Sequence, residues 1–146
     1  MELDKAMAIS ASALEVQRQR MNVIASNLAN VNSTKSTNGA PYRRRDVLIR
    51  ADRTVTQPFG ALMNRSGLTD PPGVKAVKII EDQRPPRQMY EPLHPDANAE
   101  GFVMMPDINT IEEMVNLIGA SRANEANVTA MGVTKSMTQR ALEIGR

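Results

Sequence analysis

Few side chains in this chain of 146 residues have the types and spacing that chemistry requires. The single histidine, His94, lies close to Pro92 and Pro95, and no second histidine is present to complete a metal site or a catalytic triad. Cysteine is absent, which excludes disulfides, thiolate metal sites and a cysteine nucleophile. A hydrolase built around His94 is one hypothesis, and a packing or surface role for this side chain is favoured over it.

Two pairs of carboxylates are close enough in sequence to suggest general acid–base chemistry: Asp96 with Glu100, and Glu112 with Glu113. Neither pair has an evident apolar pocket that would separate its two pKa values. Adjacent residues on a helix do not face each other, which removes the second pair. No glycine-rich phosphate loop follows a strand. The sequence therefore predicts no catalytic residue, no cofactor and no metal, and a protein that is not an enzyme.

Basic residues gather at one place, from Arg43 to Arg45 with Arg50 and Arg53 beyond, in a chain of net charge +2. A nucleic-acid site would combine such a patch with several stacking aromatics, and only Tyr42 is adjacent. Charge on an edge strand also prevents unwanted strand pairing. A small nucleic-acid-binding protein is thus a second hypothesis, but a solvated edge is favoured and no nucleic-acid partner is expected.

The sequence predicts a long amphipathic helix at each end of the chain, and these two helices are its largest structural elements. The first has apolar residues at a seven-residue spacing, with a companion set between them, which is typical of a helix that packs along another helix. These positions are Met7, Leu14, Met21 and Leu28, with Leu3, Ile24 and Val31. The second helix has its own apolar stripe: Ile111, Met114, Val115, Ile118, Ala126, Val133 and Met137. We expect the two stripes to bury against each other first, and the apolar surface that remains to be covered by another molecule.

The first helix is expected to end at Asn30 or Asn32, in a stretch rich in amide and hydroxyl side chains. Asn27 and Asn30 lie one turn apart on one face. Such a cluster is either a frayed helix end with local turns, or a set of polar groups in the packed seam that fixes helix register. The spacing leaves both interpretations open. Both asparagines are included among the predicted subunit-packing residues.

Two glycines, Gly119 and Gly132, interrupt the second helix, where each costs about 1 kcal/mol relative to alanine. They indicate either simple flexibility or close approach of another helix backbone, and the second interpretation is favoured. Asp107 or Asn109 is expected to cap the start of this helix.

The chain is thus predicted to be α+β, with paired, coiled-coil-like terminal helices and a small middle subdomain rich in strands, proline and glycine. Residues 1–33 and 108–146 form the helices of an inner α-domain, and residues 34–107 hold all nine prolines. Within that segment, residues 45–50 and 53–56 are predicted to pair around a turn at Ala51 and Asp52. Residues 57–73 are predicted to be a mobile loop, residues 74–81 a half-buried strand, and residues 85–90 and 101–105 extended runs.

No apolar run approaches the ~20 residues that a membrane span requires. The N-terminus lacks a basic region followed by an apolar block, so no secretory signal is predicted. If the protein leaves the cytoplasm, we expect a route that does not read such a signal.

Several motifs are recognisable in order along the chain. SNLANVNS at 26–33 resembles the asparagine-rich signature of bacterial flagellar axial proteins, and GAPYRR at 39–44 resembles that of rod proteins. The approach to the last helix and the helix itself resemble the FlgC-type proximal-rod family. The matching segments are YEP at 90–92, HPDAN at 94–98, GFV at 101–103, MPDIN at 105–109, EEMV at 112–115, ASR at 120–122 and EANV at 125–128. The family usually has an aromatic residue at the position of Asn124.

The resemblance implies a non-enzymatic subunit of the flagellar basal-body rod, the drive shaft that crosses the periplasmic space. It implies export through the flagellar type III export apparatus without a cleaved Sec signal, and helical stacking of the terminal helices around a central export channel. The partners it implies are copies of itself, other flagellar rod proteins, and adjacent basal-body components such as the membrane-ring/rod adaptor.

Overall fold

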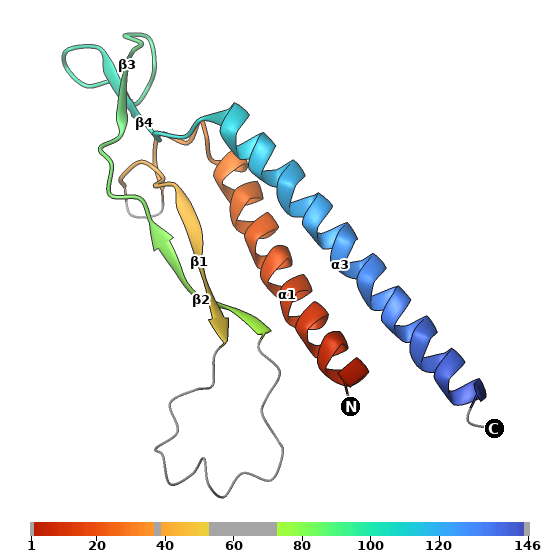
Figure 1. The fold of residues 1–146 in the computed structure, drawn as a ribbon. Helices are drawn as coiled ribbons and strands as arrows, with labels where there is room; N and C mark the ends of the chain where they lie inside the picture. The colour runs from red at the N-terminus through yellow and green to blue at the C-terminus, as the bar shows by residue number, and fades with distance from the viewer. Residues whose placement is uncertain (1, 37–38, 53–72, 145–146) are drawn as a thin grey trace, which may run out of the picture.

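The computed structural model describes residues 2–36, 39–52 and 73–144, and it has the predicted α+β class (Figure 1). A long helix lies at each end of the chain, and antiparallel strands lie between them. In chain order the elements are α1 (Glu2–Ala29), β1 (Arg45–Asp52), β2 (Gly73–Glu81), β3 (Arg87–Tyr90), β4 (Phe102–Met105) and α3 (Thr110–Ile144). The coiled-coil-like geometry of the helix pair stays a prediction.

Helix α1 occupies the centre of the fold. Helix α3 runs antiparallel along one side of it, and the ribbon formed by β1 and β2 lies along the other (Figure 1). Helix α1 has 28 residues and α3 has 35, and α3 continues past the start of α1. Among the described residues, α1 has neighbours on two sides and α3 on only one, so α1 is the more enclosed helix.

The helix ends follow the expected capping chemistry. Helix α1 ends at Ala29, just before the predicted positions, and the Asn30 side chain donates from Nδ2 to the carbonyl oxygen of Ser26 at 2.8 Å. At the start of α3, Asn109 Oδ1 accepts from the backbone N–H groups of Ile111 at 3.0 Å and Glu112 at 3.4 Å. Asn109 is therefore the N-cap, one of the two residues predicted for that role.

Strand β1 pairs with β2 in antiparallel register, from Arg45 opposite Glu81 to Asp52 opposite Gly73. The predicted turn at Ala51 and Asp52 is wrong, since both residues continue the strand opposite β2. Strand β1 pairs with the distant strand β2, which is rich in β-branched residues, and does not turn back at these two residues as the predicted short hairpin required. Residues 53–56 lie outside the described residues, as does the predicted loop up to residue 72. Residues 74–81 form the predicted strand, but most of it is exposed.

The two extended runs predicted near the second helix form a second, separate antiparallel pair, β3 with β4. Tyr90 lies opposite Phe102 at the end of this hairpin, with their rings edge to face and 5.3 Å between centroids. A loop of residues 91–101 connects the two strands.

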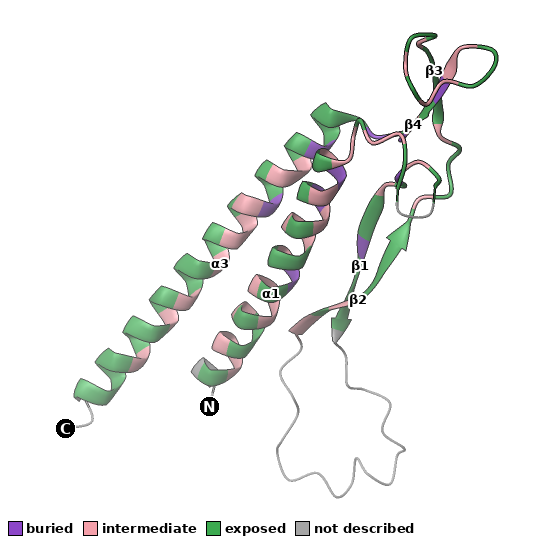
Figure 2. Cartoon of the chain, turned by 180° about the vertical axis from the view of Figure 1, so that it is seen from behind, coloured by how far each residue is buried: buried purple, intermediate pink, exposed green. Residues whose placement is uncertain are grey.

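The buried core is small. Figure 2 shows that buried residues are few and that exposed residues dominate α3. The buried apolar side chains include Val16 and Ile24 of α1, Val47 of β1 and Ala120 of α3. Over the described ranges, neither helix combines the length and the apolar character needed to cross a membrane.

Candidate subunit interface

Asn27 is fully buried near the end of α1, and its amide group uses its whole hydrogen-bonding capacity. Oδ1 accepts from the backbone N–H of Arg45 at 3.0 Å and from the hydroxyl of Tyr42 at 3.1 Å. Nδ2 donates to the carbonyl oxygen of Arg45 at 2.8 Å and to Glu113 Oε2 at 2.9 Å. One side chain therefore connects α1 to the start of β1 and to the first turn of α3.

Glu113 is the other buried polar residue of this junction, with a side chain that is 1% exposed. Its second oxygen, Oε1, accepts from Arg44 Nε at 2.8 Å. Burial by itself would lower the pKa of Arg44. The hydrogen bond to Glu113 and the charge of that carboxylate have the opposite and larger effect, so the pKa of Arg44 lies above its usual value. The buried carboxylate is thus paired with a permanent cation, as a buried charge requires.

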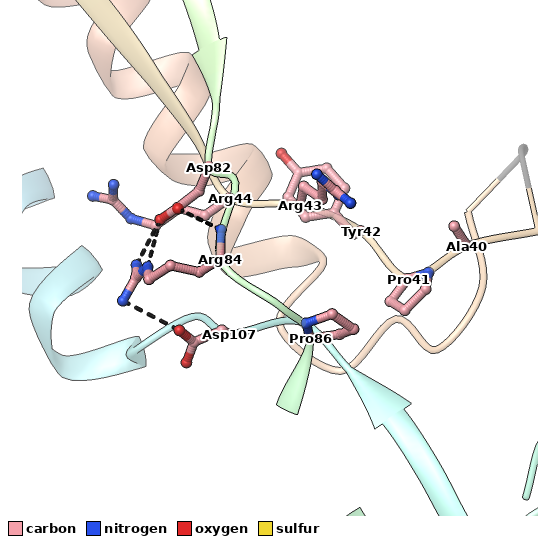
Figure 3. Close-up of a pocket in the computed structure, with 9 residues that line it drawn as sticks. All are labelled: Ala40, Pro41, Tyr42, Arg43, Arg44, Asp82, Arg84, Pro86 and Asp107. Atoms are coloured by element: carbon pink, nitrogen blue, oxygen red, sulfur yellow. Dashed lines mark hydrogen bonds and ion pairs between the residues drawn. The ribbon is translucent and has the colours of Figure 1, made fainter. Parts of the chain in front are cut away.

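A second set of polar contacts, made by ion pairs, lies beside this junction in the pocket shown in Figure 3. Arg84 lies between Asp82 and Asp107, with nitrogen–oxygen distances of 2.7 Å and 3.2 Å. Hydrogen bonds from Arg84 lower the pKa of Asp82 below its usual range. These ion pairs join the end of β2 to the segment that leads into α3.

The basic cluster is divided among intramolecular partners. Arg44 pairs with Glu113, and Arg45 pairs with Glu81 at 2.9 Å while its guanidinium lies over the Tyr42 ring, 5.4 Å from the centroid. Tyr42 is itself buried. Two of the three consecutive arginines therefore have acidic partners within the chain, Arg44 in the enclosed junction and Arg45 at the surface, and the Tyr42 ring already contacts Arg45.

His94 and Asp96, which were considered for catalysis, are bonded to other groups of the fold. The backbone N–H of Asp96 donates to His94 Nδ1 at 3.1 Å, and the carboxylate of Asp96 accepts from Lys35 and, at 2.6 Å, from the hydroxyl of Thr34. The hydrogen bond from Lys35, then that from Thr34, lowers the pKa of Asp96, so this tether is lost only as the pH falls below the usual range of an aspartate. In the described part of the chain, no three histidine or acidic side chains form a group that could hold a metal ion.

The predicted packing residues of the first helix are largely enclosed. Ile24 and Asn27 are buried, and the others are half-buried: Met7, Leu14, Met21, Leu28, Asn30 and Val31. The side chain of Leu3 lies outside the described residues. Asn27 is buried and bonds to α3, so its position matches the interpretation of a polar group in the packed seam. Asn30 bonds to the carbonyl oxygen of Ser26, so its position matches the interpretation of a local helix end.

The predicted packing residues of α3 lie on its uncovered face. Ala126 is exposed, and the larger side chains are 52–74% exposed: Ile111, Met114, Val115, Ile118, Val133 and Met137. The expectation that this stripe buries against α1 is therefore wrong. Glu113 must reach Asn27 and Arg44, which turns the apolar stripe of α3 away from α1.

The face that α3 presents to α1 is built from mostly small and polar residues. They recur every seven positions in two sets: Glu113, Ala120, Asn127 and Thr134, with Leu117, Asn124, Met131 and Thr138. All eight are buried or half-buried. This seam was not predicted from the sequence, because only apolar residues were considered. The seven-residue spacing of these small and polar residues is the signal in the sequence that indicates the seam. Asn124, at the position where the resemblance predicts an aromatic residue, lies on this seam.

Comparisons with known proteins match both helices that this junction joins. Residues 7–35, which include Asn27, match the family model described as "Flagella basal body rod protein". Residues 99–144, which include Glu113, match "Flagellar basal body rod FlgEFG protein C-terminal". Among curated proteins, the chain is 46% identical to the flagellar basal-body rod protein FlgC of Bacillus subtilis (strain 168), covering 94% of this chain and 95% of the relative.

The chain belongs to the FlgC family. It is also 39% identical to the Salmonella typhimurium FlgC over 94% of both chains, and 36% identical to the Borreliella burgdorferi FlgC over 99% of this chain and 98% of the relative. These matches confirm the resemblance to flagellar rod proteins. As a member of the FlgC family, the chain is a structural component of the flagellar basal-body rod.

The hydrogen bonds of Asn27 predict that this side chain is important for the stability of this FlgC family member. Asn27→Leu keeps the approximate volume of the side chain but removes the partner of Glu113 Oε2 and of both backbone groups of Arg45, while Glu113 Oε1 keeps its bond to Arg44. The free energy of unfolding should fall by at least ~2 kcal/mol, because each unsatisfied buried group costs about 1–3 kcal/mol. Urea unfolding followed by circular dichroism measures this change. Asn22→Leu, on the exposed side of α1, is the control, and equal loss in both variants would contradict the role assigned to Asn27.

Proposed function

We propose that this chain is a rod subunit that assembles helically through α1 and α3, forming part of the drive shaft around a central export channel. The observation that supports this proposal is the uncovered apolar face of α3, which no element of the chain covers in the described residues. A rod is built from heterologous contacts repeated along an axis, and such contacts need a surface that the subunit itself leaves free.

The energetics favour assembly. Fully burying a large apolar side chain is worth about 1.5–3 kcal/mol, so completing the burial of the half-exposed side chains on α3 gains about 1 kcal/mol each. Six such residues lie on the predicted stripe of α3, from Ile111 to Met137. Their sum is large enough to offset much of the entropy lost when a subunit joins an assembly.

The polar junction supports the mechanical part of the proposal. A drive shaft transmits torque only if each subunit keeps its shape. Asn27, Arg44 and Glu113 hold the helix pair and the ribbon in one fixed relation through buried, charge-assisted hydrogen bonds. In this proposal, residues 1–33 and 108–146 form the inner α-domain, and residues 34–107 form an outer part attached to it.

The proposed location is the rod in the periplasmic space, reached through the flagellar type III export apparatus without a cleaved Sec signal. The proposed partners are copies of this chain, other rod proteins and the membrane-ring/rod adaptor. A small core and the absence of cysteine suit export in an unfolded state, because no disulfide has to be reduced and little packing has to be undone.

The α3 face can be tested directly with Ile118→Asp. The side chain is 53% exposed in the subunit, so the stability of the isolated protein should change by less than about 0.5 kcal/mol. A charge buried in a subunit interface is costly, so incorporation into basal bodies and swimming should both be lost. Gln139→Asp, on an exposed position of the same helix, is the matched control and should assemble. Normal swimming of the Ile118→Asp strain would contradict the proposed interface.

Gly119 offers a test in which two measurements change in opposite directions. A Cβ added at Gly119 meets nothing within 4 Å in the single chain, so Gly119→Ala should stabilise the isolated subunit by up to about 1 kcal/mol. If glycine serves close approach of a neighbouring helix, the same substitution should reduce incorporation into basal bodies. Thermal melting and immunoblots of purified basal bodies measure the two effects. Unchanged incorporation would restore the flexibility interpretation.

A further inference from the structure

The loop of residues 91–101, called the tip below, is ordered by its own hydrogen bonds. The backbone N–H of Glu91 donates to the carbonyl oxygen of Gly101 at 2.9 Å, and Asn98 Oδ1 accepts from the N–H groups of Glu100 and Phe102. Gly101 has a φ of 84°, and a Cβ there would lie 2.9 Å from the Tyr90 ring. Glycine thus permits Tyr90 to close over the loop, which fixes the conformation of the tip.

This ordered tip presents an apolar side chain to solvent. Leu93 is 99% exposed, and Tyr90 beside the loop is 65% exposed. The ion pair between Asp96 and Lys35 ties the loop back to the segment after α1. Because the loop is ordered within the subunit, docking Leu93 into a hollow would require little further loss of conformational entropy. Glu91 and Glu100 give the tip a negative charge.

A complementary surface lies on the ribbon of β1 and β2. Leu48 lies opposite Lys78, and Ile80 lies on the same side of β2 because alternate residues of a strand share a face. The register shifts after Leu48, and beyond the shift Arg50 continues the side of Leu48 and lies opposite Lys75. This ribbon face, defined by Leu48, Arg50, Lys78 and Ile80, is exposed. Lys78 and Ile80 also line an open hollow beside it, whose other lining residues include the ion pair of Arg45 and Glu81. Asp46 lies on this side too, opposite Ile80, but its single negative charge is outweighed by those of Arg50 and Lys78, so the face is basic and apolar.

We propose that the tip of one subunit docks on the ribbon face of a second copy of this chain, with Leu93 between Leu48 and Ile80 and Glu100 beside Lys78. The occupant is inferred from complementarity: the acidic tip with its exposed Leu93 and the basic, apolar ribbon face occur on the same chain. Figure 1 shows the tip beyond the ends of β3 and β4, apart from the ribbon. Two different patches that fit each other give a head-to-tail contact, which repeats along an open array. This inference rests on the proposed rod function and adds a contact outside the helices.

Disulfide trapping tests the contact, since the natural chain has no cysteine. The double variant Leu93→Cys, Ile80→Cys, oxidised in purified basal bodies, should give a ladder of cross-linked multiples of the chain on a non-reducing gel. A mixture of the two single variants should stop at dimers. The double variant Leu93→Cys, Asn22→Cys, with the second thiol on the exposed side of α1, is the control and should give no ladder.

Charge exchange supplies an independent measurement. Lys78→Glu or Glu100→Lys in the double-cysteine chain should each lower the cross-linking yield by about fivefold, and the two together should restore it. Monomers alone in basal bodies that contain the chain would overturn the inference while leaving the proposed rod function standing. A cross-link to a different basal-body component would also overturn it, because the second copy would not be the occupant. Absence of the chain from basal bodies would overturn both proposals.

Discussion

The hydrogen bond between Asn27 and Glu113 is the interaction on which the other contacts depend. It joins residues that are 86 positions apart, and it is buried, so both groups must find their partners or remain unsatisfied at considerable cost. Arg44 neutralises the carboxylate, and the backbone of Arg45 and the hydroxyl of Tyr42 make the remaining hydrogen bonds of the amide. Together these contacts determine which side of α3 faces α1. They leave the apolar side of α3 free, so a polar interaction inside the subunit creates the surface on which assembly is proposed to depend.

Local signals in the sequence predicted the local structure well. The seven-residue spacing from Met7 to Leu28 predicted α1, and the amide-rich stretch placed its end within three residues. Asn109 was one of two candidates for the cap of α3, and the β-branched residues of 74–81 indicated β2. The partner of β1 was predicted wrongly, because strand pairing across a long separation depends on register with distant residues rather than on turn residues nearby.

The candidate interface was predicted only in part. Asn27 was predicted to be a packing residue, and the spacing did not decide between a frayed helix end and a packed seam. Its burial was not predictable, because it depends on Arg45 and Glu113, which are distant in sequence, both binding the same amide. Glu113 was considered only as a member of a catalytic pair and was set aside. Its burial depends on Arg44, which is 69 positions away and was read as part of a solvated cluster. The apolar stripe of α3 was recognised, but the inward seam of Glu113, Ala120, Asn127 and Thr134 was not, because helix faces are usually assigned by hydrophobicity.

The separation of Asn27 from Glu113 has a consequence for how the chain acquires its structure. A product truncated before the last helix lacks the carboxylate, so the amide of Asn27 and the guanidinium of Arg44 have no common acceptor. Contacts between distant positions also form late, because a long loop must close first. A chain that ends before Glu113 therefore cannot complete this junction, and its first helix and ribbon lack the buried link that joins them to α3.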